Sequence, residues 1–341
     1  MAENGGATLI TGGAGYIGSH AVLALRQAGR RVVVLDDLST GSRQVVPEDV
    51  ALVVGDAGDK ALVRRLIAKY GIDSVIHFAG SILVEQSVSE PLRYYHNNVS
   101  VTRNLLEACS EAGVSRVIFS STAAVYGAPD EVPITEAAPT RPINPYGSSK
   151  LVIEWMLRDL AQASDLRYVA LRYFNVAGAD PEGRSGQLGP VATHLIKIAS
   201  QVVAGARDSI AIFGEDYDTP DGTCVRDYIH VSDLAAAHLA ALEYLEAGGE
   251  SCSLNCGYGH GYSVREVLQA VERCTGKPLN PRPAPRRPGD PPSLVADVSA
   301  LRRTLQWSPR YDNLDVIITT AVEWEKSVTP PAWEVLGRAR A

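Results

Sequence analysis

The sequence predicts a doubly wound α/β fold, with helices on both faces of a parallel sheet. Short apolar runs of strand length recur through the first half of the chain, and segments with the 3.6-residue apolar period of helices separate them. A glycine-rich turn joins the first run to the first helical segment. Strands that are connected by crossover helices form parallel sheets, so we expect one large parallel sheet.

The elements follow one another in regular order. We expect strands at 7–11, 32–35, 51–54, 74–78, 117–119 and 168–171. We expect helices after the glycine turn as far as Gly29 and at 59–70, 91–112 and 145–163. Ligands of such sheets bind at the carboxyl ends of the strands. The residues at or just beyond these ends are 12–18, Asp36, Asp56, 78–80, Thr122 and Asn175.

The glycine turn indicates a dinucleotide site. Residues 12–18 fit two patterns, G-x-x-G-x-x-G and G-x-G-x-x-G. Glycines allow a tight turn and let a pyrophosphate approach the N–H groups of a helix N-terminus, as in Rossmann domains. Asp36 ends the next strand, where a carboxylate accepts from a ribose 2′-OH and repels a 2′-phosphate. Asp36 therefore favours NAD over NADP.

Tyr146 and Lys150 are the candidate acid–base pair. Pro145 suits the first position of a helix, and residues four apart share one helix face. An ammonium near a phenol lowers the phenol pKa, which makes a base for an alcohol proton. Two other polar side chains have ordinary interpretations: His77 as a hydrogen-bonded core histidine, and Asn97 or Asn98 as a partner of a neighbour or of the nicotinamide.

The second half has a looser pattern and predicts a smaller mixed α/β cap that binds the substrate. We expect helices at 190–205, 232–246 and 312–326. We place an NAD-binding Rossmann domain at 1–178 and the cap mainly at 179–341, with some segments returning to the first domain. A cleft between the two is the expected substrate site.

Composition excludes several classes of function. The 341-residue chain carries a net charge of -7, which disfavours nucleic acid and anionic membranes as partners. It lacks an apolar run of about 18 residues, and its first residues lack a basic n-region, so we expect neither a membrane span nor a secretion signal. Its five cysteines lack C-x2-C spacing. We expect reduced thiols, no metal site and a cytoplasmic protein.

Several motifs together resemble the extended short-chain dehydrogenase/reductase family and, within it, the UDP-glucose 4-epimerases, over about 7–328. The motifs are TGGAGYIGSH at 11–20, HFAG at 77–80, FSST at 119–122, VYG at 125–127, PYGSSK at 145–150, RYFNVAG at 172–178, AIFG at 211–214, DGTCVRDYIHV at 221–231 and RRPGD at 286–290. The resemblance implies reversible C4 epimerisation of UDP-glucose and UDP-galactose through a 4-keto sugar. It also implies tightly bound NAD, a role in galactose metabolism and a homodimer.

The resemblance also implies residue roles. Tyr146, Lys150 and Thr122 would be catalytic. The residues implied at the cofactor are Gly12, Gly15, Tyr16, Ile17, Gly18, Asp36, Asp37, Asp56, Ala57, Phe78, Ala79, Gly80, Asn97, Thr122, Tyr146, Lys150 and Phe174. Those implied at the substrate are Thr122, Tyr146, Asn175, His194, Leu195, Ala211, Ile212, Phe213, Arg226, Tyr228, Arg287, Asp290 and Leu294.

The chain departs from the family pattern at three positions. Ile82 stands where a lysine is frequent, which removes a cation beside the cofactor. His194 replaces a frequent asparagine and still carries a donor for a phosphate. Leu294 stands where some members have a tyrosine, so a wider pocket for N-acetyl sugars is a hypothesis.

Three alternative functions stay open on the sequence. A 4-epimerase of UDP-N-acetylhexosamines or UDP-pentoses differs from the main interpretation only in the sugar. A dehydratase of sugar nucleotides needs acidic residues after Thr122, where Ala123 and Ala124 stand. A non-catalytic NAD-sensing protein would not need the intact pair of Tyr146 and Lys150.

Overall fold

A computed structural model describes residues 6–188, 193–287 and 289–328. The central sheet has seven parallel strands in the order β11-β6-β5-β4-β1-β2-β3. The strands are β1 Ala7–Thr11, β2 Val32–Asp36, β3 Ala51–Val54, β4 Ile72–His77, β5 Arg116–Thr122, β6 Arg167–Tyr173 and β11 Cys252–Cys256. The prediction of a doubly wound parallel sheet is confirmed.

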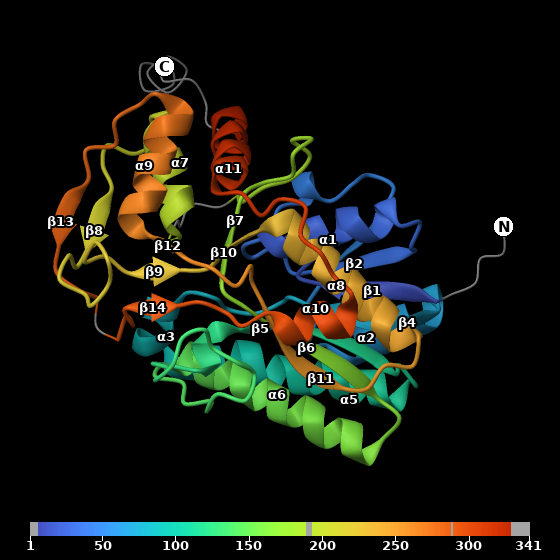
Figure 1. The fold of residues 1–341 in the computed structure, drawn as a ribbon. Helices are drawn as coiled ribbons and strands as arrows, with labels where there is room; N and C mark the ends of the chain where they lie inside the picture. The colour runs from blue at the N-terminus through green and yellow to red at the C-terminus, as the bar shows by residue number, and fades with distance from the viewer. Residues whose placement is uncertain (1–5, 189–192, 288, 329–341) are drawn as a thin grey trace.

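Helices cover both faces of this sheet (Figure 1). One face carries α1 Tyr16–Gln27 and α8 Val231–Glu246, and the other carries α2 Lys60–Tyr70, α5 Val101–Glu111 and α6 Pro145–Ala163. The strand order reverses direction at β1, because β2 lies on one side of it and β4 on the other. Such a reversal opens a crevice at the carboxyl ends of the strands, where ligands bind.

A second group of elements lies beyond the carboxyl ends of the sheet (Figure 1). Its helices are α7 Leu195–Ala204, α9 Val264–Thr275 and α11 Leu314–Val328. Its strand pairs are β7 Asn175–Ala177 with β10 Tyr228–His230 and β8 Ala211–Phe213 with β13 Arg282–Ala284. Its three-stranded sheet contains β12 Tyr262–Ser263, β9 Val225–Arg226 and β14 Ser293–Leu294.

The remaining described helices are short. They are η1 Arg43–Val45, α3 Val84–Ser89, α4 Pro91–Tyr94, η3 Ala123–Val125 and α10 Ser299–Leu305. The single helix expected at 91–112 is wrong in detail, because the π-helical segment Tyr95–Ser100 separates α4 from α5. The Asn98 amide of this segment is turned inward to Ser81 and Ser149. The helix expected at 190–205 begins at Leu195 within the described residues, and 189–192 lie outside them.

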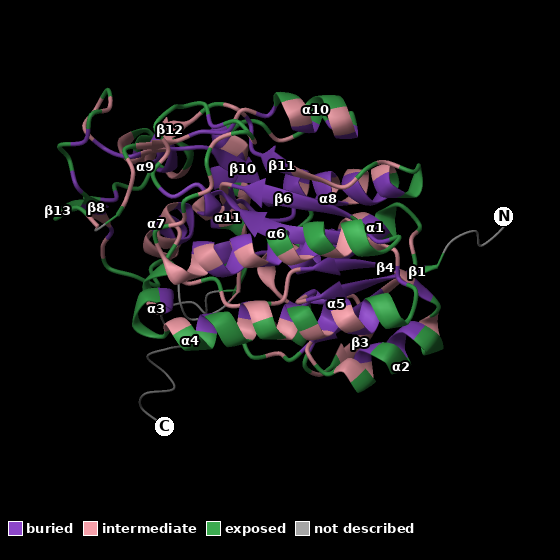
Figure 2. Cartoon of the chain, turned by 90° about the horizontal axis from the view of Figure 1, so that it is seen from below, coloured by how far each residue is buried: buried purple, intermediate pink, exposed green. Residues whose placement is uncertain are grey.

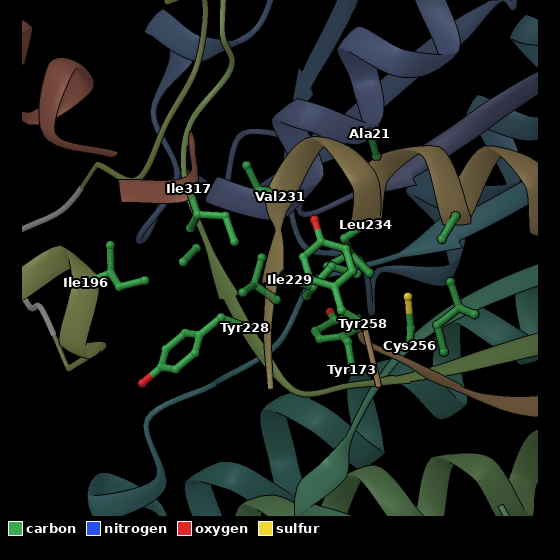
Figure 3. Packing of buried hydrophobic residues seen from close by; sticks show 14 of the residues in the cluster. Ala21, Tyr173, Ile196, Tyr228, Ile229, Val231, Leu234, Cys256, Tyr258 and Ile317 are labelled. Carbon is green, nitrogen blue, oxygen red and sulfur yellow. The ribbon is translucent and has the colours of Figure 1, made fainter. Parts of the chain in front are cut away.

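One apolar core joins the sheet to the second group of elements. Figure 3 shows this cluster extending from Ile196 of α7 through Ile229 of β10 to Tyr258 and Cys256. Figure 2 shows the strands buried between their helices. The second half of the chain also supplies β11, which completes the sheet beside β6, and α8. The division near residue 178 stays a prediction.

Candidate active site

The glycine turn after β1 has the geometry of a dinucleotide cradle. Gly12 has a φ of +71°, and a Cβ on Gly18 would lie 2.2 Å from the Gly12 carbonyl oxygen. Gly15 is the N-cap of α1 and supplies no side-chain cap, and the first turn of α1 holds no acidic residue. The helix N-terminus is therefore open to an anion, so the residues fit the pyrophosphate of a dinucleotide.

Asp36 links the second strand to this turn. Its carboxylate accepts from the backbone N–H groups of Ala14 at 2.9 Å and Leu38 at 2.8 Å. Burial raises the Asp36 pKa, and the two N–H donors act against that shift. The carboxylate thus holds the glycine turn in place at the end of β2, where a ribose is expected.

The other predicted cofactor residues of the first three strands differ in their surroundings. Tyr16 donates from its hydroxyl to the Gly178 carbonyl at 2.7 Å, and Ile17 packs partly against the core. Asp37 and Asp56 accept from backbone N–H groups of their own turns, at Ser39 and Gly58. Ala57 is buried in the core, so only its backbone can face a ligand.

The loop after β4 lies beside the catalytic helix. An ideal Cβ on Gly80 would lie 2.9 Å from Asn98 Oδ1 and 4.0 Å from Lys150 Nζ. Asn98 accepts from the Ser81 backbone N–H at 2.7 Å and donates to Ser149 Oγ at 2.9 Å. Asn97 donates to Ser81 Oγ at 3.1 Å. Asn98, which is buried, therefore fixes this loop against α6, and the contact of Asn97 with a cofactor stays a prediction.

Two aromatic residues flank this region, and the exposed Ile82 follows it. The Phe78 ring packs on His238 with centroids 4.7 Å apart. Phe174 packs against a small buried cluster that includes Ala123 and Leu151. His77 is fully partnered, by Thr11 Oγ1 at 2.6 Å and Thr102 Oγ1 at 2.7 Å. Its interpretation as a hydrogen-bonded core histidine is confirmed.

The catalytic candidates lie where α6 meets the carboxyl end of β5. Asn144 caps α6 by accepting from the Gly147 N–H at 2.9 Å, and Pro145 occupies the first turn. These signals start the helix one residue before Tyr146. The Tyr146 phenol forms a side-chain hydrogen bond with Thr122, and Lys150 Nζ donates to the Ser120 carbonyl at 2.9 Å.

Burial shifts the pKa of both groups. It raises the Tyr146 pKa to about 12, and the hydrogen bond with Thr122 acts in the lowering direction. It lowers the Lys150 pKa to about 8. The expected lowering of the Tyr146 pKa by the Lys150 ammonium is not among these causes and stays a prediction for the loaded enzyme. In the loaded enzyme, the positive charge of the NAD nicotinamide would add to that of Lys150, and a positive charge near a phenol lowers the phenol pKa.

Other predicted substrate residues line a pocket between β7, β10, α7 and α11, with about 390 Å³ of empty volume. These are Asn175, His194, Leu195 and Tyr228, together with Tyr16. Figure 3 shows Tyr228 beside Ile196 of α7. The buried Nδ1 atom of His194 has no hydrogen-bond partner among the described residues, so it could serve a ligand. Tyr146, Lys150 and Thr122 do not line this pocket.

The predicted nucleotide-binding residues meet at β8, β9 and β14. The Arg287 guanidinium lies 4.0 Å from the centre of the Phe213 ring. Arg226 Nη2 donates to Asp290 Oδ1 at 2.6 Å. Leu294 is the register partner of Arg226 and packs against the same buried cluster as Phe174. The structure therefore brings the cap strands next to the catalytic region.

The predicted nucleotide-binding residues on β8 and β9 differ in which of their atoms can reach a ligand. Ala211 begins β8 and is half-buried, whereas Ile212 is buried in the core and offers only its backbone. Arg226 and Asp290 form an ion pair with each other. The sequence predicts a separate ligand contact for each of them and does not predict this pair. A phosphate that bound Arg226 would replace Asp290 as its partner.

Sequence reasoning missed two buried ion pairs near these sites. Lys197 of α7 pairs with Glu325 of α11 at the edge of the pocket. Arg172 of β6 pairs with Glu154 of α6 at 2.6 Å. Glu154 continues the four-residue spacing of Tyr146 and Lys150, and this signal could have identified it.

The described residues form neither a metal-binding cluster nor a membrane-spanning helix. Within the residues that the structure describes, no group of three or more His, Cys, Asp or Glu side chains is placed to hold a metal ion. No helix in the same ranges is long and apolar enough to cross a membrane.

Comparisons with known proteins agree on one family. The model of the NAD dependent epimerase/dehydratase family matches residues 8–257. The chain is 58% identical over 320 residues to the UDP-glucose 4-epimerase of Azospirillum brasilense, covering 94% of this chain and 92% of that protein.

Solved structures give the same result for the fold. The UDP-glucose 4-epimerase from Brucella ovis in complex with NAD matches with a TM-score of 0.92 and 46% identity, covering 94% of this chain and 99% of that chain. The enzyme from Stenotrophomonas maltophila with bound NAD and formylated UDP-arabinopyranose matches with a TM-score of 0.91 and 40% identity, covering 98% and 100%. The chain therefore belongs to the NAD-dependent epimerase/dehydratase family and, within the extended short-chain dehydrogenase/reductases, to the UDP-glucose 4-epimerases.

Proposed function

We propose that this protein interconverts UDP-glucose and UDP-galactose by inverting C4 through a 4-keto sugar, with NAD as its resident cofactor. One observation carries the proposal: a partly buried phenol, a buried ammonium and a hydroxyl converge at the carboxyl end of β5, beside an open dinucleotide cradle. This arrangement suits removal of the O–H proton of an alcohol whose carbon loses a hydride in the same step.

The residues of this chain have distinct tasks in that reaction. Tyr146, as phenolate, takes the proton of the 4-OH while the O–H electron pair forms the C4 carbonyl. The cofactor, held by the glycine turn and Asp36, would supply a hydride acceptor for C4 that also returns the hydride to the opposite face, so no external oxidant would be consumed. Thr122 bridges the 4-OH and the phenol, because a hydroxyl both donates and accepts. On the return step Tyr146 gives the proton back to O4.

The cap would hold the UDP part while the sugar turns over. Arg226 and Arg287 would bind the diphosphate, since guanidinium groups bind phosphate through paired hydrogen bonds. Phe213 is 37% exposed, which leaves its ring open for a base to stack on. Asp290 would accept from the uridine ribose. Asn175 and His194 line the pocket and would contact sugar or phosphate.

Two rival activities of the fold lack support. Ala123 and Ala124 follow Thr122 in the 3-10 turn, so no carboxylate stands there for a dehydration. A non-catalytic protein would have no use for the buried Tyr146 and Lys150. Epimerisation of UDP-N-acetylhexosamines or UDP-pentoses uses the same chemistry, and Leu294 beside Phe174 is the residue that would decide the sugar.

The test is turnover of UDP-galactose by the purified protein without added NAD. We expect UDP-glucose to form, because the cofactor is regenerated in each turnover and can stay bound. A 4-keto-6-deoxy product would instead indicate a dehydratase. Absence of reaction with both UDP-hexoses, while UDP-N-acetylglucosamine or UDP-xylose reacts, would move the proposal to that sugar.

A homodimer is a further part of the proposal. A groove between α5 and α6 has Leu106, Met156 and Leu160 in its lining. Trp155 on α6 is 47% exposed and Leu92 on α4 is 80% exposed. Apolar surface of this kind is typical of an interface, and light scattering would give the mass.

The proposal extends to the cellular setting. All five cysteines are free thiols, which suits a reducing compartment such as the cytoplasm. The interconversion of UDP-glucose and UDP-galactose places the enzyme in galactose metabolism. Complementation of a cell that lacks this activity would test both statements.

A further inference from the structure

Helix α6 contacts strand β5 through three polar side chains spaced one turn apart. Tyr146 hydrogen-bonds with Thr122, and Lys150 Nζ donates to the Ser120 carbonyl at 2.9 Å. One turn later, Ser121 Oγ donates to Glu154 Oε1 at 2.5 Å. The last three residues of β5 are therefore each tied to one residue of α6.

Arg172 of the neighbouring strand β6 holds Glu154 in the third of these contacts. Arg172 Nε lies 3.0 Å and Nη2 lies 2.6 Å from the two carboxylate oxygens of Glu154. Ser121 and Arg172 are register partners of β5 and β6, so their side chains leave the sheet on the same face. Glu154 is 4% exposed and Arg172 is 8% exposed.

Arg172 is held in turn by groups beyond Glu154. Its Nη1 donates to Tyr126 Oη at 2.9 Å, and its guanidinium lies 5.1 Å from the centre of the Tyr126 ring. The Tyr126 hydroxyl donates to Asn255 Oδ1 of β11 at 2.7 Å. The pair is thus part of a chain of contacts from α6 to the edge strand of the sheet.

We propose that Glu154 and Arg172 are positioning residues for the reaction, because their buried ion pair sets the register of α6 against β5 and so aligns Tyr146 with Thr122. This inference rests on the proposed function for its kinetic consequence. Neither residue touches the reacting atoms, and both act through Ser121 and the helix.

The location of the Glu154–Arg172 pair indicates that it aligns α6 with β5 and does more than fill space between them. Apolar residues such as Phe119, Ile153 and Tyr168 fill the rest of the interface between α6 and the sheet. Replacing a buried ion pair by apolar side chains is often neutral or stabilising, so stability alone does not call for one here. The charged pair stands only at the end of this interface where Ser120, Ser121 and Thr122 face the catalytic residues.

Four hydrogen-bonding or titratable groups lie around the Tyr146 phenol. Thr122 of β5 hydrogen-bonds with it, Tyr94 of α4 and Tyr173 of β6 interact with it electrostatically, and Lys150 lies on its own helix. The Thr122 hydrogen bond is the contact that lowers the Tyr146 pKa. A slip of α6 along β5 would weaken that bond and move the Tyr146 pKa upward.

The experiment compares Glu154→Gln and the double variant Glu154→Met/Arg172→Met with wild type. We expect kcat for UDP-galactose to fall at least tenfold in both, with KM changed less than about twofold. The acid limb of the kcat profile should move to higher pH. Leu66→Ala is the control: it removes a buried side chain of α2, and it should lower stability while leaving kcat and the pH profile unchanged.

The double variant keeps the proposal testable if the single variant unfolds, since it leaves no unpaired buried charge. A folded double variant with the kcat and pH profile of wild type would overturn the inference. Inactivity of the wild type toward every UDP-sugar would overturn the proposed function instead. The register would then be read from the carbon-13 NMR signal of Tyr146 Cζ, which should move in the double variant and stay in Leu66→Ala; an unmoved signal would refute it.

Discussion

Lys150 Nζ lies 2.9 Å from the carbonyl oxygen of Ser120 and 5.0 Å from the centre of the Phe119 ring. The ammonium is therefore anchored to β5 and is 2% exposed. Burial lowers its pKa to about 8, whereas burial raises the Tyr146 pKa to about 12. The two shifts have opposite signs because burial disfavours the charged form of each group, the phenolate of Tyr146 and the ammonium of Lys150.

The first prediction concerns the pH dependence of kcat/KM. The phenolate fraction of Tyr146 rises about tenfold per pH unit below its pKa, and the ammonium fraction of Lys150 falls about tenfold per unit above about pH 8. Their product rises with pH up to about 8 and is level beyond it. A pH series of kcat/KM for UDP-galactose should show this break, and Lys150→Met should be slower and lack it. A break that persists in Lys150→Met would assign it to another group.

The second prediction concerns the base itself. Tyr146→Phe removes the hydroxyl and keeps the ring, so we expect turnover to fall by about 10³-fold or more while NAD stays bound. Single-turnover assays and the NAD content of the purified protein measure the two effects. Tyr70→Phe, on α2, is the matched control and should behave as wild type. An active Tyr146→Phe variant would remove this residue from the mechanism.

Local signals explain why much of the fold could be predicted. The bounds of α6 match the expected 145–163, because Asn144 and Pro145 mark its start and the apolar period continues to its end. The strand ends were visible because polar residues and glycines interrupt the apolar runs. These ends then share one edge of the sheet as a consequence of its parallel topology.

Other features depend on tertiary contacts that leave no local pattern. The π-helical segment Tyr95–Ser100 adds one residue to a helical turn, which the period of α4 and α5 does not reveal. Strand β11, Cys252–Cys256, has too few apolar residues to stand out, and its pairing with β6 stabilises it. The pairs Glu154–Arg172 and Arg226–Asp290 join residues that are distant in sequence, so only the fold reveals them.

The third prediction concerns stability in acid. Burial lowers the pKa of His238 and His20 to about 4 and that of His77 and His230 to about 3. The unfolded chain takes up these protons below about pH 6.5, whereas the folded protein stays neutral until pH 4 or below. Stability is therefore present above about pH 6.5 and is lost as pH falls toward the folded pKa values, by about 1.4 kcal/mol per pH unit for each histidine.

His238→Leu tests this linkage at one site. His238 is fully buried, its Nε2 atom has no partner among the described residues, and its Nδ1 atom contacts only the Leu234 carbonyl of its own helix, so an apolar residue leaves no buried side-chain donor unpaired. We expect urea unfolding between about pH 4.5 and 6.5 to show a slope smaller by about 1.4 kcal/mol per pH unit. His96→Leu, at an exposed position, should leave the slope of wild type. An unchanged slope in His238→Leu would contradict a neutral buried imidazole.

The fourth prediction concerns the choice of sugar. Leu294 pairs in register with Arg226 and, like Phe174, packs against the buried cluster that includes Ala123, so it joins the strand of Arg226 to the turn that follows Thr122. A leucine there leaves more room than a tyrosine, and we expect turnover of UDP-N-acetylglucosamine beside UDP-glucose. Leu294→Tyr should lower kcat/KM for the N-acetyl sugar by about tenfold to a hundredfold and change that for UDP-glucose little, since the loss is steric. Val295→Ile, at the buried residue that follows this strand, is the control for added bulk. Equal losses for both sugars would show that the tyrosine disturbs Arg226 instead of narrowing the pocket.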